Sequence, residues 1–204
     1  LWDEAGKLGF IGGNLPEESG GGGAGMYELS IVMEEIAAAG TGLLMLVVSP
    51  AICGNIIVRF GTDEQKQRWV PGLADGSYVM AFGITEPDAG SNSHRITTTA
   101  HRDGSDWILN GQKVFISGVD QADSVLIVAR TADAKTGKLK PALFVVPTDA
   151  PGFTRTMIEM ELVNPEKQFQ LFFDDVRLPA DALIGDEDAG LAQLFAGLNP
   201  ERIM

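Results

Sequence analysis

The chain has 204 residues, of which 45% are hydrophobic and 21% charged, and its formal net charge is −13. These proportions are typical of a globular protein of one or two domains. The acidic balance argues against binding to nucleic acid or to an anionic membrane surface, because both depend on clustered Lys and Arg. The single cysteine, Cys53, excludes an internal disulfide framework and a cysteine-rich metal site. Its apolar helical surroundings predict a buried structural thiol.

No apolar run reaches the length of a membrane span. The nearest, Leu43 to Ile52, is interrupted by Ser49 and Pro50. The chain opens inside a helical pattern without a cleavable leader and ends just after a predicted helix start, so we expect an internal piece of a longer protein. A cytoplasmic location in a bacterium, or alternatively the mitochondrial matrix, is compatible with the lack of disulfides.

The first 76 residues read as helical. Met26 to Ala39 places apolar side chains on one face at three- and four-residue steps. A second, more uniformly apolar helix is expected from Gly40 to Phe60, with a bend near Pro50.

A third helix is expected to begin after Thr62. Thr62 and Gln65 form a capping box, and acidic residues occupy the first turn. We expect this helix to end near Val70 and Pro71, because proline interrupts the hydrogen bonding of a helix interior.

From residue 77 the chain alternates short β-rich runs with turn residues. Connections such as Asp103-Gly104, Asn110-Gly111 and Thr136-Gly137 suit hairpin turns. Many short strands without intervening helices predict an antiparallel barrel or sandwich. The candidate strands are Val79–Ile84, Thr97–Arg102, Trp107–Asn110, Lys113–Ile116, Ser124–Thr131, Ala142–Pro147, Thr154–Met157 and Gln170–Asp174.

Helical periodicity resumes at Asp188, and Asn199, Pro200 and Glu201 resemble the N-cap, N1 and N2 positions of a further helix. The expected fold is therefore α+β with segregated domains. An N-terminal helical domain covers 1–76, a middle β domain covers 77–185, and 186–204 begin a C-terminal helical domain.

Three common motifs are rejected. Gly20, Gly22 and Gly25 match GxGxxG, but a dinucleotide fingerprint needs a preceding strand and a βαβ unit, so a flexible loop between helices is the better interpretation. The only histidines, His94 and His101, have no cysteine partner nearby and are expected in surface or turn positions. No GxSxG elbow surrounds any serine.

The segment GITEPDAGSN ends a predicted strand in a turn that can present polar groups to a ligand. Pro87 fixes the turn, and Gly90 permits a positive φ. The turn would expose the Thr85 hydroxyl, backbone amides and Ser91 to an anionic or heterocyclic ligand. In a second segment, NGQKVFISG, the residues Phe115, Ile116 and Ser117 can wall and hydrogen-bond a flat ring.

Together these segments resemble, in order and spacing, the two flavin-contacting segments of the acyl-CoA dehydrogenases. Further stretches follow the same family's pattern, and the resemblance covers essentially the whole chain. It implies the family's N-terminal helical and middle β domains, with the C-terminal helical domain absent. The further stretches are FGTDEQKQRWVPGLADG, RDGSDWILNGQKVFISG, LFFDDVRLPADALIGDEDAG and GLNPERI.

The resemblance assigns FAD contacts to the first segment. Phe82, Ile84 and Thr85 match positions beside the isoalloxazine ring, with Thr85 hydrogen-bonding its edge. Ser91 matches a serine near the FAD pyrophosphate and the pantetheine part of CoA.

In the second segment, Phe115 matches an aromatic residue, Trp in many members, that packs on the flavin beside Ile116. Ser117 matches a hydroxyl residue, commonly Thr, near the hydride-accepting nitrogen. The replacements by Phe and Ser leave flavin binding credible but could alter its potential or oxygen reactivity.

The implied reaction is α,β-dehydrogenation of an acyl-CoA thioester, in which a carboxylate removes the α proton and the β hydrogen leaves as hydride to FAD. Most members carry the catalytic Glu in the C-terminal domain. A minority use a Glu just before an Arg at a helix start, the location of Glu201 and Arg202. A helix N-terminus also favours Glu without any catalytic role. Arg202 is expected to brace the helix start or the catalytic carboxylate, on the substrate side of the site with Ser91.

The same resemblance implies an electron-transfer flavoprotein as acceptor, a role in fatty acid β-oxidation, and a homodimer or homotetramer. Three alternatives stay open. These are an acyl-CoA oxidase-like flavoenzyme, a non-catalytic flavin- or CoA-binding relative, and a β-barrel lipid binder without flavin, which leaves the paired segments unexplained.

Overall fold

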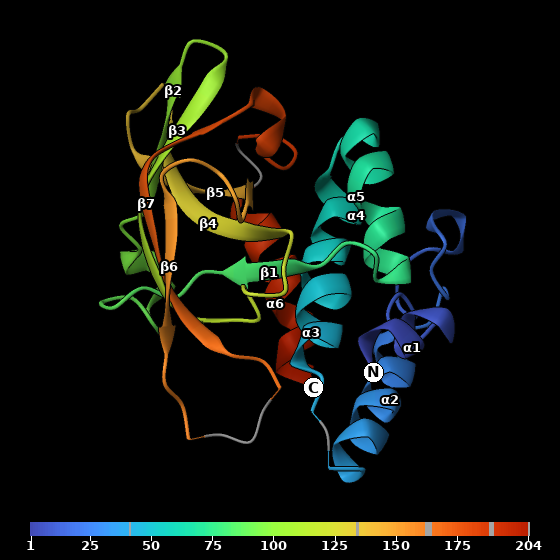
Figure 1. Cartoon of the computed structure of the whole chain (residues 1–204). Helices are drawn as coiled ribbons and strands as arrows, with labels where there is room; N and C mark the ends of the chain where they lie inside the picture. The colour runs from blue at the N-terminus through green and yellow to red at the C-terminus, as the bar shows by residue number, and fades with distance from the viewer. Residues whose placement is uncertain (41, 134, 162–164, 188–189, 204) are drawn as a thin grey trace.

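The computed structural model describes residues 1–40, 42–133, 135–161, 165–187 and 190–203, the side chains of 200–203 excepted. Helices form one side of the molecule and a curled β-sheet the other, with the last helix lying between them (Figure 1). The predicted order of helices, β domain and helix is confirmed.

The first 75 residues contain helices joined by turns and loops and no strand among the described residues, which agrees with the predicted helical segment. The helical elements are α1 (Trp2–Lys7), η1 (Glu17–Ser19), α2 (Met26–Ala38), α3 (Leu44–Leu46), η2 (Val47–Gly54), α4 (Asn55–Phe60) and α5 (Asp63–Asp75). The glycine cluster lies between η1 and α2 rather than after a strand, which agrees with a loop between helices.

The elements α3, η2 and α4 form one uninterrupted helical run, and η2 is π-helical around Pro50. The widened turn lies where the sequence predicts a bend, because proline has no amide to donate. The Ser49 hydroxyl accepts from the Met80 amide at 3.0 Å, which ties this run to the first strand. Cys53 is buried, as predicted, and burial raises the pKa of its thiol.

The capping box of α5 is confirmed. The backbone amide of Gln65 donates to the Thr62 hydroxyl at 3.3 Å, and the backbone amide of Thr62 donates to the side-chain oxygen of Gln65 at 3.0 Å. The predicted end near Val70 and Pro71 is wrong, since α5 continues to Asp75. Burial of apolar side chains on both sides of Pro71 outweighs its missing hydrogen bond, and Gly76 ends the helix with φ 79°.

Seven strands form one curled sheet in the order β1-β4-β2-β3-β7-β6, with β5 on β4. Most pairs are antiparallel, as predicted, but β4 pairs in parallel with β1 and β2, so the sheet is mixed. The strands are β1 (Met80–Gly83), β2 (Thr99–Asp103), β3 (Asp106–Ser117), β4 (Ser124–Ala132), β5 (Leu139–Pro147), β6 (Phe153–Ile158) and β7 (Gln168–Leu178).

One predicted hairpin is absent from this sheet. Asp103-Gly104 does connect β2 to β3, but Asn110-Gly111 lies inside β3 and forms no hairpin turn. The pairing register with β7 shifts between Leu109 and Gly111, where Gly111 has φ 143°. A Cβ at Gly111 would lie 2.7 Å from the Thr98 Cα, so the glycine serves close backbone packing at a bulge.

The helix α6 (Gly190–Ile203) follows a short turn, η4 (Ala180–Ala182), and packs against η2 and β5. The helix start predicted at Asn199 is wrong, because α6 begins at Gly190 and continues through Pro200. Packing of its apolar residues, such as buried Leu194, outweighs the local signal of Asn-Pro. One apolar core lies inside the sheet and a second between the sheet and the helices. Among the described residues, no helix has the length and apolar character needed to cross a membrane.

Candidate functional site

A groove of about 130 Å³ lies where the two motif segments meet the central helical run. Six of the seven predicted FAD-contact residues line it together, although the two segments are far apart in the sequence. The helical run supplies the opposite wall with three aliphatic side chains. The lining residues are Leu44, Val48, Ile52, Phe82, Ile84, Thr85, Phe115, Ile116 and Ser117.

The sequence did not single out the individual wall residues, but the apolar helices around Leu43 to Val58 were expected to form the base of the acyl pocket. Leu44, Val48 and Ile52 recur at four-residue steps, a spacing that places side chains on one helix face. That periodicity could have identified them. It could not have indicated which surface they face.

Phe115 has an unusual backbone and an unusual exposure. Its φ is 59°, in the left-handed region that bulky residues avoid, and its side chain is 59% exposed. The register of β3 against β7 shifts between Lys113 and Ile116, so Phe115 lies in a bulge. Bulges redirect side chains near functional sites. Here the bulge presents an aromatic ring at the groove.

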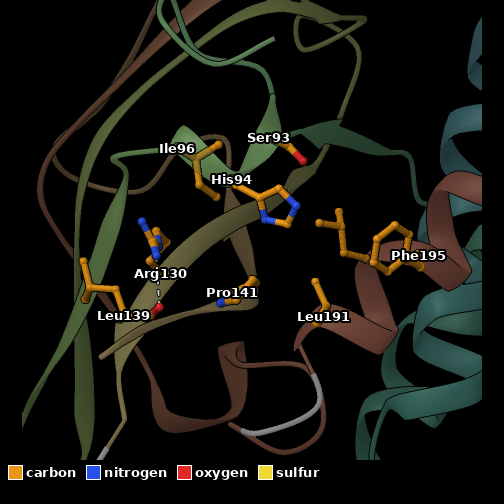
Figure 2. A pocket seen from close by; sticks show the side chains of 9 residues that line it. Ser93, His94, Ile96, Arg130, Leu139, Pro141, Leu191 and Phe195 are labelled. Carbon is orange, nitrogen blue, oxygen red and sulfur yellow. Dashed lines mark hydrogen bonds between the residues drawn. The ribbon is translucent and has the colours of Figure 1, made fainter. Parts of the chain in front are cut away.

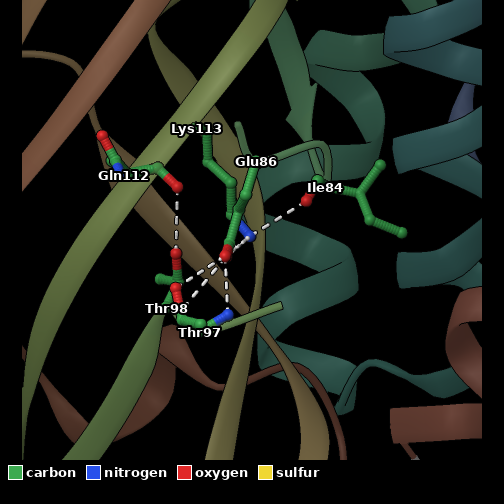
Figure 3. A network of polar contacts seen from close by, with 6 residues as sticks. All are labelled: Ile84, Glu86, Thr97, Thr98, Gln112 and Lys113. Carbon is green, nitrogen blue, oxygen red and sulfur yellow. Dashed lines mark hydrogen bonds and ion pairs between the residues drawn. The ribbon is translucent and has the colours of Figure 1, made fainter. Parts of the chain in front are cut away.

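Behind the groove, Lys113 and Glu86 form a buried ion pair (Figure 3). Lys113 Nζ lies 2.8 Å from Glu86 Oε1, and the two side chains are 0% and 3% exposed. The Glu86 carboxylate also accepts from the Thr97 amide at 2.6 Å, the Thr97 hydroxyl at 2.8 Å and the Thr98 amide at 3.0 Å. Both charges are therefore compensated despite their burial.

The surroundings keep both groups ionised at neutral pH. Burial alone would raise the pKa of Glu86, but hydrogen bonds from Lys113 and Thr98, the Lys113 charge and the Thr97 amide lower it to about 2. Burial lowers the pKa of Lys113 to about 8, against the opposing effect of Glu86.

Two further contacts join the groove's strands. The Val114 amide donates to the Thr85 carbonyl at 2.9 Å, which fixes one motif segment against the other. The Ser117 hydroxyl accepts from the Gln168 side chain at 2.7 Å and so has a defined position at the groove's edge. Thr85 and Ser117 thus place two hydroxyls among apolar walls.

Ser91 is the predicted FAD-contact residue that does not line the groove. It is exposed in the bend between β1 and the short helix η3 (Ser93–Arg95). Glu201 and Arg202 lie in the last turns of α6, and their side chains are outside the described residues.

A second hollow of about 200 Å³ separates η3 and the β4–β5 strands from α6 (Figure 2). Ser93 and His94 lie on one side and Leu191 and Phe195 on the other. None of its described lining residues is acidic, so the hollow lacks the carboxylate that would orient a Ser–His pair.

The prediction for the histidines agrees with the structure, since His94 and His101 are both exposed. Across the described residues, no three His, Cys, Asp or Glu side chains gather closely enough to hold a metal ion.

Comparison with known proteins identifies the family. A family model described as the acyl-CoA dehydrogenase N-terminal domain matches residues 1–77, and one described as the acyl-CoA dehydrogenase middle domain matches residues 81–176. Acyl-CoA dehydrogenase FadE12 of Mycobacterium tuberculosis is 78% identical over 204 residues, which are 100% of this chain and 53% of that protein.

Two solved structures share the fold. One, a glutaryl-coenzyme A dehydrogenase with glutaryl-CoA, has a TM-score of 0.90 and 33% identity over 98% of this chain and 52% of its own. A glutaryl-CoA dehydrogenase from Mycobacterium smegmatis with FADH2 has a TM-score of 0.88 and 37% identity over 99% of this chain and 51% of its own. The chain spans about half the length of these relatives. On these matches and on its fold, the chain belongs to the acyl-CoA dehydrogenase family.

Proposed function

We propose that the full-length protein carrying this chain is an FAD-dependent acyl-CoA dehydrogenase that converts an acyl-CoA thioester to the enoyl-CoA. The observation that carries the proposal is the groove. Six residues selected for flavin contact in two separate segments line one surface. A related dehydrogenase was solved with FADH2 and another with glutaryl-CoA, which supports the same ligand classes here.

The groove fits a flavin ring on chemical grounds. Phe115 offers an exposed aromatic face and Ile116 an apolar wall, while the hydroxyls of Thr85 and Ser117 can hydrogen-bond a ring edge. Phe82 on β1 and Ile84, directly after the strand, complete this wall. Bound FAD would supply the hydride acceptor for the reaction.

The opposite wall suits the acyl part of the substrate. Leu44, Val48 and Ile52 present aliphatic surface, which favours an acyl chain over a polar group. Ser91, exposed on the turn after β1, is the residue that we assign to the FAD pyrophosphate and the pantetheine of CoA.

Proton removal from the α carbon needs a carboxylate. We consider two candidates, Glu201 and a Glu outside this chain. Because α6 starts at Gly190, Glu201 does not occupy the first turn of a helix, and the helix dipole gives no separate reason for its presence. Arg202 would brace this carboxylate on the substrate side.

Replacing Glu201 by Gln in the full-length enzyme tests this assignment. If Glu201 is the base, flavin reduction by substrate should slow by at least about a hundredfold while FAD stays bound. A rate within a few-fold of wild type would assign the base to a Glu outside this chain.

We further propose that electrons pass to an electron-transfer flavoprotein, that the enzyme is a homodimer or homotetramer serving fatty acid β-oxidation, and that it works in the bacterial cytoplasm. A mycobacterial relative at 78% identity supports the bacterial assignment. No nucleic-acid or membrane partner is proposed, given the net charge of −13.

The decisive experiment is purification of the full-length protein followed by anaerobic titration with a panel of acyl-CoAs. A yellow protein whose flavin absorbance is bleached by an acyl-CoA supports the proposal. A colourless protein that cannot be reconstituted with FAD would refute it. A flavin that no acyl-CoA reduces would indicate a non-catalytic binder, and rapid aerobic turnover with release of peroxide would indicate an oxidase.

A further inference from the structure

The segment Ile84 to Glu86 carries one wall of the groove and is anchored from behind by Lys113. The ammonium donates to the Ile84 carbonyl at 3.1 Å and to the Glu86 carboxylate at 2.8 Å. The Ile84 side chain points away from the pair, toward the helices (Figure 3). One cation therefore holds both neighbours of Thr85.

The anchoring of the Ile84 carbonyl also fixes the direction of the Thr85 backbone amide. In a trans peptide the carbonyl and the amide point in opposite directions. A carbonyl of Ile84 that faces Lys113 therefore turns the Thr85 amide away from the ammonium. The Thr85 carbonyl is fixed separately by the Val114 amide at 2.9 Å. The backbone on both sides of the Thr85 side chain is thus constrained.

Stability alone does not account for this arrangement. Burying two charges has a desolvation cost that their attraction often fails to offset, and apolar replacements of similar volume are often as stable. A ligand-binding wall has a stricter requirement, because its groups must keep a fixed position relative to the ligand. The pair meets that requirement at the one threonine of the groove.

We propose that the Glu86–Lys113 pair positions Thr85 for its contact with the flavin edge, so that both are positioning residues of the reaction. The inference rests on the proposed function. It predicts that flavin properties depend on the pair even when the protein remains stably folded.

Two substitutions in the full-length holoenzyme separate positioning from stability. Lys113→Met removes the donor to Ile84 and leaves the buried Glu86 charge without its counter-charge, although the donors of Thr97 and Thr98 remain, so both stability and flavin binding should fall. In the double variant Glu86→Gln/Lys113→Met no buried charge is left. The double variant should recover thermal stability but not the lost anchor of the Ile84 carbonyl.

We expect the double variant to melt above Lys113→Met and nearer to wild type, yet to bind FAD about tenfold more weakly, because Thr85 would no longer be held in place for the flavin edge. Its flavin should also show a shifted visible absorption band and a changed reduction potential. Thr97→Val removes one hydrogen bond to Glu86 and keeps both charges, so it should shift the flavin properties in the same direction by less. If the double variant does not fold, the flavin affinity, spectrum and potential of Thr97→Val test the proposal instead.

The matched control is Gln65→Leu, which removes a buried hydrogen-bonded side chain away from the groove. It should lower the melting temperature and leave the flavin spectrum and potential unchanged. The proposal is overturned if the pair variants keep wild-type FAD affinity, spectrum and potential, or if Gln65→Leu shifts these properties as much. A wild-type protein that binds no FAD would instead refute the proposed function, and this inference with it.

Discussion

Lys113 Nζ lies 2.8 Å from Glu86 Oε1, although the two residues are 27 positions apart in the chain. The contact joins the segment that follows β1 to the middle of β3, and the groove opens beside this junction. The same two segments carry the residues matched to flavin contact. The ion pair therefore holds together the same two segments that supply the predicted flavin contacts.

The stability of the chain should depend on Glu86 at acid pH. Its folded-state pKa is about 2 against an ordinary value of 4.5, so its ionised form stabilises the fold fully above about pH 4.5 and progressively less as the pH falls toward 2. The difference in unfolding free energy between wild type and Glu86→Gln should shrink over this interval by on the order of 3 kcal/mol. Urea unfolding of both proteins at several pH values measures it. A difference that stays constant with pH would contradict the lowered pKa.

We expect the left-handed backbone of Phe115 to lower the stability of the protein, while its ring contributes to FAD binding. Phe115→Gly removes both the ring and the strain of φ 59°, whereas Phe115→Ala removes the ring and keeps the strain. The glycine variant should be more stable than the alanine variant by about 1 kcal/mol. Both variants of the full-length protein should bind FAD more weakly than wild type. Equal stabilities in denaturant titration would show that the left-handed backbone is not strained.

Cys53 should resist thiol reagents in the folded protein. The thiol is fully buried, its pKa is raised, and it donates to the Ala81 carbonyl at 3.6 Å, so little reactive thiolate is available. A chromogenic disulfide reagent should label it only as fast as the protein unfolds. Rapid stoichiometric labelling without denaturant would disprove the buried placement.

Gln65 should contribute more to stability than its neighbours on the surface of α5. Its side chain donates to the carbonyls of Asp181 and Leu183 at 2.8 and 2.7 Å and also caps the helix. Gln65→Ala should cost about 2–3 kcal/mol, since it leaves the buried contact at the Leu183 carbonyl and the part-buried one at the Asp181 carbonyl without a donor and also removes the helix cap. The exposed Gln67→Ala is the matched control and should stay within about 0.5 kcal/mol of wild type. Similar losses in guanidinium unfolding for both variants would refute the role given to Gln65.

The sequence predicts those parts of the fold that depend on local signals. The capping box at Thr62 and the alternating strands are set by neighbours in the chain, and both are present. Predictions failed where distant packing outweighs a local rule. Pro71 does not end α5, and Gly111 does not turn the chain because Thr98 packs against it within a continuous strand.

The residues of the candidate site also fall into those that could be predicted from the sequence and those that could not. Thr85, Phe115 and Ser117 could be selected because their motif segments are contiguous in the sequence. The partnership of Glu86 and Lys113 could not, since their pairing follows from the fold of strands that are distant in sequence. The three residues of the aliphatic wall, from α3 and η2, were not singled out for the same reason, although the helices around Leu43 to Val58 were expected to form the base of the acyl pocket.

Under the proposed function, the aliphatic wall limits how the preference for an acyl chain can change. Ile52 is only 1% exposed and belongs to the core between helices and sheet, whereas Leu44 and Val48 are half-buried at the groove. A smaller residue at position 52 would enlarge the groove but also open a cavity in the core. Natural or engineered adaptation to longer acyl chains should therefore proceed through positions 44 and 48, where changes of size leave the folded state largely intact.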